Sequence, residues 1–282
     1  MIVKCDNILY EQCKGLWREV FGDNDEFISY YFKERTSPRF VLCDVDEERN
    51  LQGMLHMIPK RIRINKTSYK AALITGVAVK KEYRGRGIAT ELLNHAETHA
   101  KQANSSFLIL QPESVQLFDF YKKLGYSVLG VHKILTKHQN IAHKSKEEQL
   151  NATPELLLSI YKNNMRRADG YVERNIKDFN LILTESALSN NVVLATSTAY
   201  AMIEVKVGEC FCYEYCGELT DCVLEMIKHS TNRENIRFNI SPYACEINCK
   251  INEVETLPFN MIKPINGTPW DTKLKFNTYE RY

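Results

Sequence analysis

A largely apolar segment at residues 73–79 leads through a short basic turn into an amphipathic segment that begins near residue 88. The first segment is typical of a buried β-strand. In the second, the apolar residues recur with the 3.6-residue period of a helix, and they are Ile88, Ala89, Leu92, Leu93, Ala96 and Ala100. The chain therefore predicts a strand that turns directly into a helix, which indicates a fold that combines helices with a sheet.

The turn itself is typical of an anion site. Gly85 and Gly87 let the backbone bend so that several N–H groups point outward where the helix begins. These N–H groups have no partner inside the helix, and together with the helix dipole they attract anions. The surrounding cations are Lys80, Lys81, Arg84 and Arg86. The segment therefore predicts a site for a pyrophosphate group.

The spacing of the glycines can be compared with the patterns of several known kinds of phosphate-binding site. The Gly-x-x-x-x-Gly-Lys-Ser/Thr pattern of a P-loop is absent, and a dinucleotide fingerprint needs glycine where this chain has Thr90. An Arg/Gly-rich nucleic-acid segment would repeat, whereas this one occurs once. The remaining pattern, Arg84, Gly87 and Ala89, resembles the acetyl-CoA signature of the GNAT superfamily of N-acetyltransferases. From this motif alone, the alternative is that the segment is an ordinary strand–turn–helix junction with a solvated basic turn and no ligand.

A second segment strengthens the resemblance. An apolar run at 107–111 ends at Pro112 and predicts a buried strand. Ser114 then caps an expected helix that stops at Gly125. Residues 120–126, Phe-Tyr-Lys-Lys-Leu-Gly-Tyr, are similar to the second GNAT hallmark. Because two linked motifs follow each other in the expected order, the chain is identified as a member of the GNAT superfamily.

The order of the expected elements agrees with that resemblance. Helices are expected at 8–21, 24–34, 87–101 and 114–124, and strands at 39–44, 52–64, 67–79, 106–111 and 127–135. The implied fold class is α+β, with a mixed central sheet in a GNAT fold at residues 1–138. A polar linker at 139–152 follows.

The second half repeats the same order of elements. Amphipathic segments begin at Pro154 and near 172–179, strands are expected at 192–195, 200–207 and 209–216, and a helix at 219–231 precedes strands at 236–240 and 258–262. Because no Arg-x-x-Gly-x-Ala pattern occurs there, we expect a degenerate GNAT-like domain at 153–264 without an acetyl-CoA site. The tandem, with segments 74–79, 171–174 and 257–261, resembles the Eis type. The tail at 265–282 is too short for the sterol-carrier-like domain of that type.

The resemblance implies direct transfer of an acetyl group from acetyl-CoA to a primary amine in a ternary complex. A bulge near Gly76 would admit the pantetheine arm, and Tyr121 would protonate the departing thiolate. A core tyrosine is the alternative for Tyr121, and packing is the alternative for His56, a possible base. Whether the tail, another base or water accepts the amine proton stays open. The expected cofactor-binding residues are Val77, Ala78, Val79, Arg84, Gly85, Arg86, Gly87, Ile88, Ala89 and Thr90.

Composition restricts the partners. A formal net charge of +2 gives no reason to expect nucleic acid or an anionic membrane, and no run of 18 apolar residues or signal peptide occurs. The odd number of cysteines, nine, favours reduced thiols in a cytoplasmic protein, and no metal is expected. The expected acceptor is a small-molecule or lysine amine, with aromatic residues of 24–34 as a candidate pocket wall. A non-catalytic acyl-CoA-binding sensor or scaffold is the alternative function, and the oligomeric state is not predicted.

Overall fold

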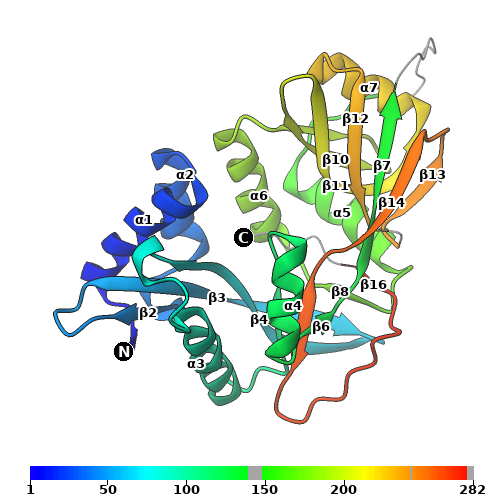
Figure 1. Cartoon of the computed structure of the whole chain (residues 1–282). Helices are drawn as coiled ribbons and strands as arrows, with labels where there is room; N and C mark the ends of the chain where they lie inside the picture. The colour runs from blue at the N-terminus through cyan, green and yellow to red at the C-terminus, as the bar shows by residue number, and fades with distance from the viewer. Residues whose placement is uncertain (139–147, 242, 278–282) are drawn as a thin grey trace. The chain divides into compact units, whose positions relative to one another are not determined.

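The computed structural model describes residues 1–138, 148–241 and 243–277, and the chain divides into two compact units (Figure 1). Unit 1 contains Met1–Val128 and Asn260–Thr272, and unit 2 contains Leu129–Phe259 and then residues 273–277. The predicted contiguous domains, 1–138 and 153–264, differ from these units: unit 1 starts at residue 1 as predicted but ends at Val128 and also contains Asn260–Thr272, and unit 2 begins at Leu129 and ends its main segment at Phe259. Of the predicted linker and tail, residues 139–147 and 278–282 lie outside the described residues.

The sheet of unit 1 is mixed, as the sequence predicts. Its strands follow the order β1-β2-β3-β4-β5-β15-β6, antiparallel except for the parallel pair β4 and β5. The strands are β1 (Ile2–Lys4), β2 (Val41–Val45), β3 (Leu51–Ile64), β4 (Thr67–Val79), β5 (Phe107–Leu110), β6 (Ser127–Val128) and β15 (Met261–Pro264).

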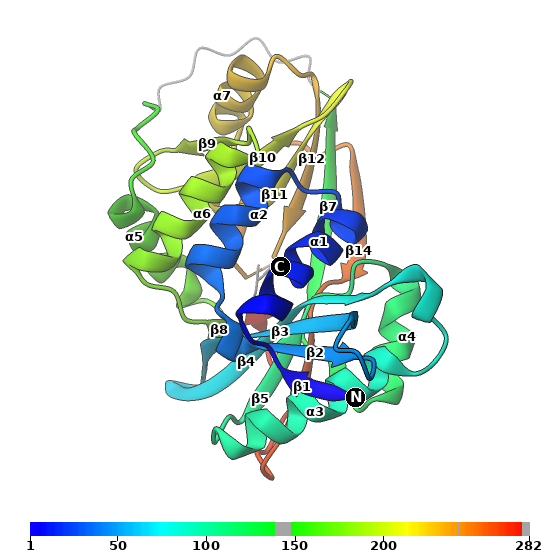
Figure 2. The same cartoon turned by 90° about the vertical axis from the view of Figure 1, so that its left-hand side faces the viewer.

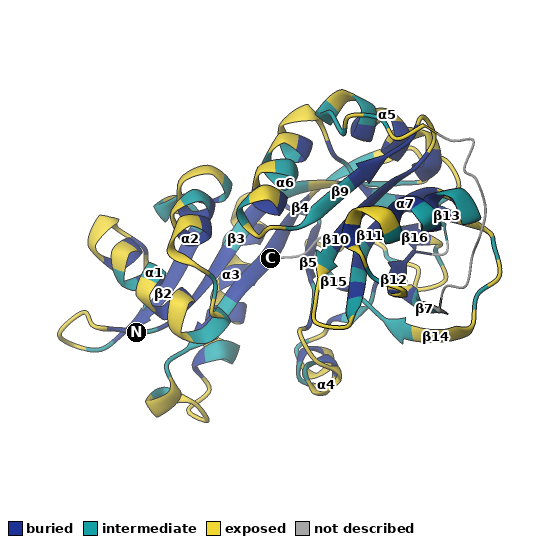
Figure 3. Ribbon diagram, turned by 90° about the horizontal axis from the view of Figure 1, so that it is seen from above, coloured by how far each residue is buried: buried dark blue, intermediate teal, exposed yellow. Residues whose placement is uncertain are grey.

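Helices cover both faces of this sheet. Figures 1 and 2 show α1 (Asn7–Phe21) and α2 (Asp25–Tyr30) on one face and α3 (Ile88–Gln102) on the other. α4 (Val115–Lys123) shares a buried apolar cluster with α3. Each helix buries one side and exposes the other, as the amphipathic periods predict (Figure 3). Short turns of other helix types lie at Tyr31–Arg35, Pro38–Phe40 and Lys81–Tyr83.

Two strands belong to different sheets from those that the sequence order predicts. The expected strand 127–135 divides into β6, in unit 1, and β7 (Val131–His138), which pairs with β12 and β14 in unit 2. The expected strand near 258–262 is β15, which lies between β5 and β6 of unit 1. Lys263 of β15 pairs with Glu97 of α3. The local pattern identifies a strand, but its pairing partner is set by contacts far away in the sequence.

Unit 2 places helices on both faces of its own sheet. The strand order is β14-β7-β12-β11-β10-β9, with β13 paired to β11. Along β10 successive residues alternate between two cores, since Tyr200 and Met202 pack with α5 and α6, and Ala201 and Ile203 pack with α7. The elements are α5 (Pro154–Met165), β8 (Gly170–Val172), α6 (Ile176–Leu188), β9 (Val192–Ala195), β10 (Tyr200–Val205), β11 (Glu209–Thr220), α7 (Asp221–Thr231), β12 (Asn235–Ile240), β13 (Cys245–Asn248), β14 (Glu253–Pro258) and β16 (Phe276–Asn277).

The structure confirms the α+β class with mixed sheets. Both units show two helices, antiparallel strands, a helix and a parallel strand in the same order. Within residues 1–138, 148–241 and 243–277, no helix combines the length and apolarity needed to cross a bilayer.

Candidate functional site

The junction between β4 and α3 has the geometry of an anion site. Gly85 and Gly87 have φ of 78° and 84°, in the left-handed region that favours glycine. A Cβ at either position would meet no atom within 4 Å, so the loop is open on that side. Gly87 is the N-cap of α3 and has no side chain to satisfy the first-turn N–H groups of Ile88, Ala89 and Thr90. These donors are therefore available to a ligand.

Arg84 and Arg86 form hydrogen bonds that hold the conformation of the loop, and they also give it positive charge. Arg84 Nε donates to the Val79 carbonyl oxygen at 3.0 Å, and Arg86 Nη2 donates to the Glu82 carbonyl oxygen at 3.1 Å. The Arg86 guanidinium also lies 5.1 Å from the centre of the Tyr83 ring. Both side chains are exposed. Since each is held by backbone of the same turn, their positive charge stays beside the helix N-terminus.

The predicted bulge in β4 is confirmed. Met54 pairs with Ala78 and His56 with Thr75, so Leu55 alone lies opposite Gly76 and Val77. Gly76 has φ of 58°, and a Cβ there would lie 2.6 Å from the Cζ3 atom of Trp17. Only glycine is accommodated at this position.

The bulge coincides with an opening between the two parallel strands. β4 pairs with β5 over residues 71–73, before the bulge, and within residues 67–110 the pairing does not continue beyond it. A cavity of about 360 Å³ lies there. Its walls come from the end of α1, from β4 and the end of β5, and from α4, and the lining residues are Trp17, Phe21, Asp23, Leu73, Ile74, Thr75, Gly76, Val77, Leu110, Gln111, Glu113, Leu117 and Tyr121.

Tyr121 is both a core residue and a wall of this cavity. Its ring packs against Phe120 and Tyr126, with ring centres 5.1 and 5.7 Å away, and only 7% of the residue is exposed. Burial raises the pKa of Tyr121 to about 12, and the charge of Glu113 adds to the rise. Among the described residues no group is hydrogen-bonded to its hydroxyl. The phenol therefore stays protonated at neutral pH.

The sequence analysis missed the aromatic and acidic residues that line the cavity. Trp17 packs against Phe21 with tilted rings whose centres are 4.6 Å apart, and Trp17 Nε1 donates to Asp23 Oδ2 at 2.8 Å. Glu113 is exposed at the end of β5. Its position directly after Pro112, where a buried strand stops, was the available signal.

The prediction that aromatic residues of 24–34 form the wall of the acceptor pocket is wrong. Phe27, Tyr31 and Phe32 are each at most 2% exposed and belong to the core, because α2 and the turn after it direct their apolar side inward. Trp17 of α1, packed 4.5 Å from Tyr31 between ring centres, forms the cavity wall instead.

The structure favours packing as the role of His56. It is fully buried, and burial lowers the pKa of the imidazole to about 3. Its ring lies 5.3 Å from Trp17, and Nδ1 is 3.4 Å from the Tyr31 hydroxyl. His56 is not among the residues that line the cavity. A buried imidazole that is so difficult to protonate is a poor acceptor for an ammonium proton.

Comparisons with known proteins agree with this architecture. A family model described as an acetyltransferase (GNAT) domain matches residues 6–129. Streptothricin acetyltransferase A of Bacillus subtilis is 27% identical over 126 residues, which cover 43% of this chain and 71% of that protein.

Solved structures extend the similarity in fold to most of the chain. A probable N-acyltransferase from Enterococcus faecalis has a TM-score of 0.71 at 17% identity, with 94% of this chain and 72% of that one covered. Eis1 from Mycobacterium abscessus has a TM-score of 0.65 at 13% identity, with 94% and 74% covered. At these identities the similarity concerns the fold alone.

Proposed function

Residues 6–129 of this chain form an acetyltransferase domain of the GNAT family, and from this premise we propose that the protein moves the acetyl group of acetyl-CoA directly to a primary amine. The two substrates would meet in a ternary complex within unit 1. The observation that carries the proposal is that Tyr121 lines the same cavity as Gly76 and Val77, at the opening between β4 and β5.

The residues of the β4–α3 junction fit acetyl-CoA. The pyrophosphate would lie on the N–H groups between Arg84 and Thr90, where two open glycines leave the backbone accessible. The pantetheine arm would lie along residues 77–79, because β4 pairs with β5 only over residues 71–73 and its edge beyond the bulge is open on that side. The thioester would then reach the cavity that Tyr121 lines.

Tyr121 is proposed to act on the leaving sulfur. As the amine nitrogen bonds to the thioester carbon and the C–S bond breaks, the nitrogen loses a proton to solvent, negative charge develops on sulfur, and the released thiolate takes up a proton. A thiol has a pKa of about 8.5, so full proton transfer from a phenol whose pKa is about 12 is uphill. The hydroxyl therefore acts chiefly as a hydrogen-bond donor that stabilises the developing thiolate. This refines the expected role of Tyr121 as a plain proton donor.

The lining of the cavity supports a cationic acceptor. Asp23 and Glu113 provide carboxylates, and Trp17 and Phe21 provide aromatic surface. Carboxylates attract an ammonium group, and aromatic faces bind cations. We propose that an acceptor with more than one amine is held by one charged amine while a second, neutral amine attacks.

The proposal is tested by measuring thiol release from acetyl-CoA with a panel of polyamines, aminoglycosides, lysine peptides and monoamines. Tyr121→Phe is expected to lower kcat by about 10²–10⁴-fold at unchanged CoA affinity, because the lost hydrogen bond forms mainly in the transition state. Tyr126→Phe is the matched control, since that ring contacts Tyr121 and is also buried. Equal rates for wild type and Tyr121→Phe with the best acceptor would make Tyr121 a packing residue only.

A further inference from the structure

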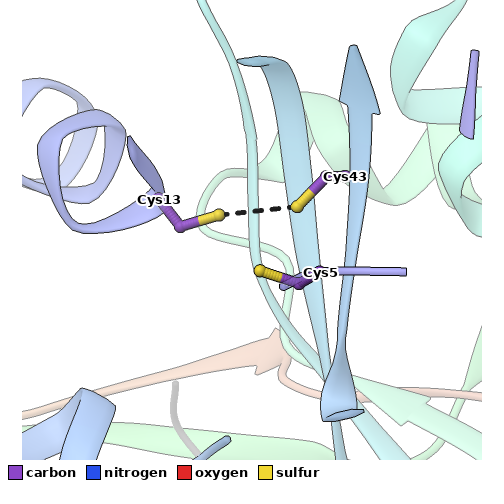
Figure 4. A group of neighbouring side chains, drawn as sticks. All are labelled: Cys5, Cys13 and Cys43. Atoms are coloured by element: carbon purple, nitrogen blue, oxygen red, sulfur yellow. Dashed lines mark hydrogen bonds between the residues drawn. The ribbon is translucent and has the colours of Figure 1, made fainter. Parts of the chain in front are cut away.

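Three cysteines of unit 1 meet in the core beside the sheet. Cys5 follows β1, Cys13 lies on α1 and Cys43 lies on β2. Figure 4 shows their side chains directed toward one another. The three sulfurs lie within 4.8 Å of one another, and the Sγ atoms of Cys13 and Cys43 are 3.6 Å apart. At most 9% of any of the three residues is exposed.

We propose that Cys5, Cys13 and Cys43 bind one soft divalent cation, such as Zn²⁺ or Cd²⁺, through three thiolates. A zinc–sulfur bond is about 2.3 Å long. At tetrahedral or trigonal angles this length separates two sulfur ligands by about 3.8–4.0 Å. The observed separation of 3.6 Å and the limit of 4.8 Å lie close to that value, so the site needs only small rotations of the side chains.

The ligand chemistry favours a soft ion with two charges. Among the described residues the group consists of these three thiols, with no histidine or carboxylate. Thiolates select soft ions. Binding releases a proton from each thiol, and three thiolates with a divalent ion leave one net negative charge, whereas a monovalent ion would leave two. Since buried charge is costly, the divalent ion is favoured.

The position of the three cysteines indicates how a metal ion would reach the site and which helix its binding would affect. β1 is a three-residue strand at the edge of the sheet, so local opening of this strand is the route by which an ion would reach the three sulfurs. Once bound, the ion would join β1, α1 and β2. Cys13 precedes Trp17 by one helical turn on the same face of α1, and Trp17 lines the acetyl-transfer cavity. The metal would therefore fix the helix that provides a wall of the cavity.

The test is a titration of the reduced, metal-free full chain with Cd²⁺ under anaerobic conditions. Cadmium–thiolate absorbance reports the bonds, a pH indicator reports released protons, and thermal unfolding reports stability. We expect one ion per chain, about two to three protons released per ion, and a rise in Tm of about 5 °C at saturating metal. Cd²⁺ added to the Zn²⁺-loaded protein should displace Zn²⁺, and the cadmium–thiolate absorbance should then appear.

Two variants and one control decide the outcome. Cys43→Ala and Cys5→Ala should each lower Cd²⁺ affinity at least a hundredfold and remove the Tm rise, with Cys5→Ala affecting the core less. Cys212→Ala removes an equally buried thiol in unit 2 and should behave as wild type. Unchanged Cd²⁺ binding in both cysteine variants would overturn the proposal. Absence of binding to reduced wild type, with a Cys13–Cys43 disulfide found after mild oxidation, would also overturn it and indicate a redox pair.

Discussion

The junctions β4–α3 and β11–α7 occupy corresponding places in the two units, yet only one is suited to a phosphate. α3 begins at Gly87, which has no capping side chain and stands beside two arginines. α7 begins at Thr220, whose hydroxyl accepts from the Val223 N–H at 3.3 Å, and Asp221 occupies its first turn. The Thr220 side chain thus satisfies one N-terminal donor of α7, and the Asp221 carboxylate repels an anion.

β4 and β11 each contain a bulge, and the bulge of β4 lies beside a cavity. β11 has a bulge because Met202 pairs with Glu214 and Ile203 with Cys212. The bulge of β4 contains a glycine and lines a cavity. The bulge of β11 instead carries Glu214, which is only 3% exposed. Its carboxylate accepts from Arg174 at 2.5 and 3.1 Å and from the Tyr200 hydroxyl at 2.6 Å. A shared backbone irregularity can therefore admit a ligand or hold a buried ion pair, depending on a few side chains.

The largest effect is expected from breaking the ion pair of unit 2. Glu214→Gln removes the carboxylate charge that binds the buried Arg174 guanidinium, which should cost about 3–5 kcal/mol of unfolding free energy in urea denaturation. Glu234→Gln removes an exposed partner of Lys228 and should cost less than about 1 kcal/mol. CoA affinity should stay unchanged in both variants. A loss below 1 kcal/mol for Glu214→Gln would mean that the ion pair is not structural.

The next effect tests the open turn of unit 1. Gly87→Val should reduce CoA affinity at least a hundredfold in calorimetry, because the side chain projects into the open space and strains a left-handed residue. Gly208→Val is the matched control, since Gly208 has φ of 81° and equally open surroundings in unit 2. If both variants lost CoA binding equally, backbone strain rather than the site would explain the result. Wild-type binding should also weaken as salt increases.

Acid should destabilise unit 1 through His56. Burial lowers the pKa of His56 to about 3, so between pH 6.5 and 3 the unfolded chain binds a proton that the folded chain does not. Stability therefore falls as pH decreases through this range, by about 2 kcal/mol between pH 7 and 5. Hydrogen exchange of unit 1 amides at the two pH values measures this change. His56→Gln should remove most of the pH dependence, and an unchanged slope would assign the effect to other groups.

The smallest effect concerns the cap of α7. Thr220→Ala removes the hydroxyl that holds the Val223 N–H and should cost about 1 kcal/mol in thermal unfolding. Thr184→Ala makes the same change at an exposed position inside α6 and should cause no loss. Should both variants be equally stable, the cap would contribute nothing and the contrast with Gly87 would rest on charge alone.

Much of unit 1 was predictable because its signals are local. The turn at Gly85 and Gly87 and the helix carrying Tyr121 each follow from a few neighbouring residues, and the bulge near Gly76 was implied by the resemblance to the GNAT superfamily. The cavity was not predictable, because Trp17 and Asp23 at the end of α1 and Glu113 after β5 come from two distant segments whose meeting depends on how helices pack on the sheet. The prediction that aromatic residues of 24–34 form a pocket wall was wrong for the same reason. An amphipathic period identifies the buried face of a helix but not which part of the protein covers that face.

The sequence by itself determined the helices, most of the longer strands, their order, the open basic turn at 84–87 and its absence from the second half, since periodicity, capping and backbone freedom act within one or two helical turns. Only the tertiary structure decided that β7 pairs in unit 2 and that β15 pairs in unit 1. It also brought Cys5, Cys13 and Cys43 together. Strand pairing and side-chain clustering are long-range choices among many compatible partners, and burial of the whole apolar surface selects between them.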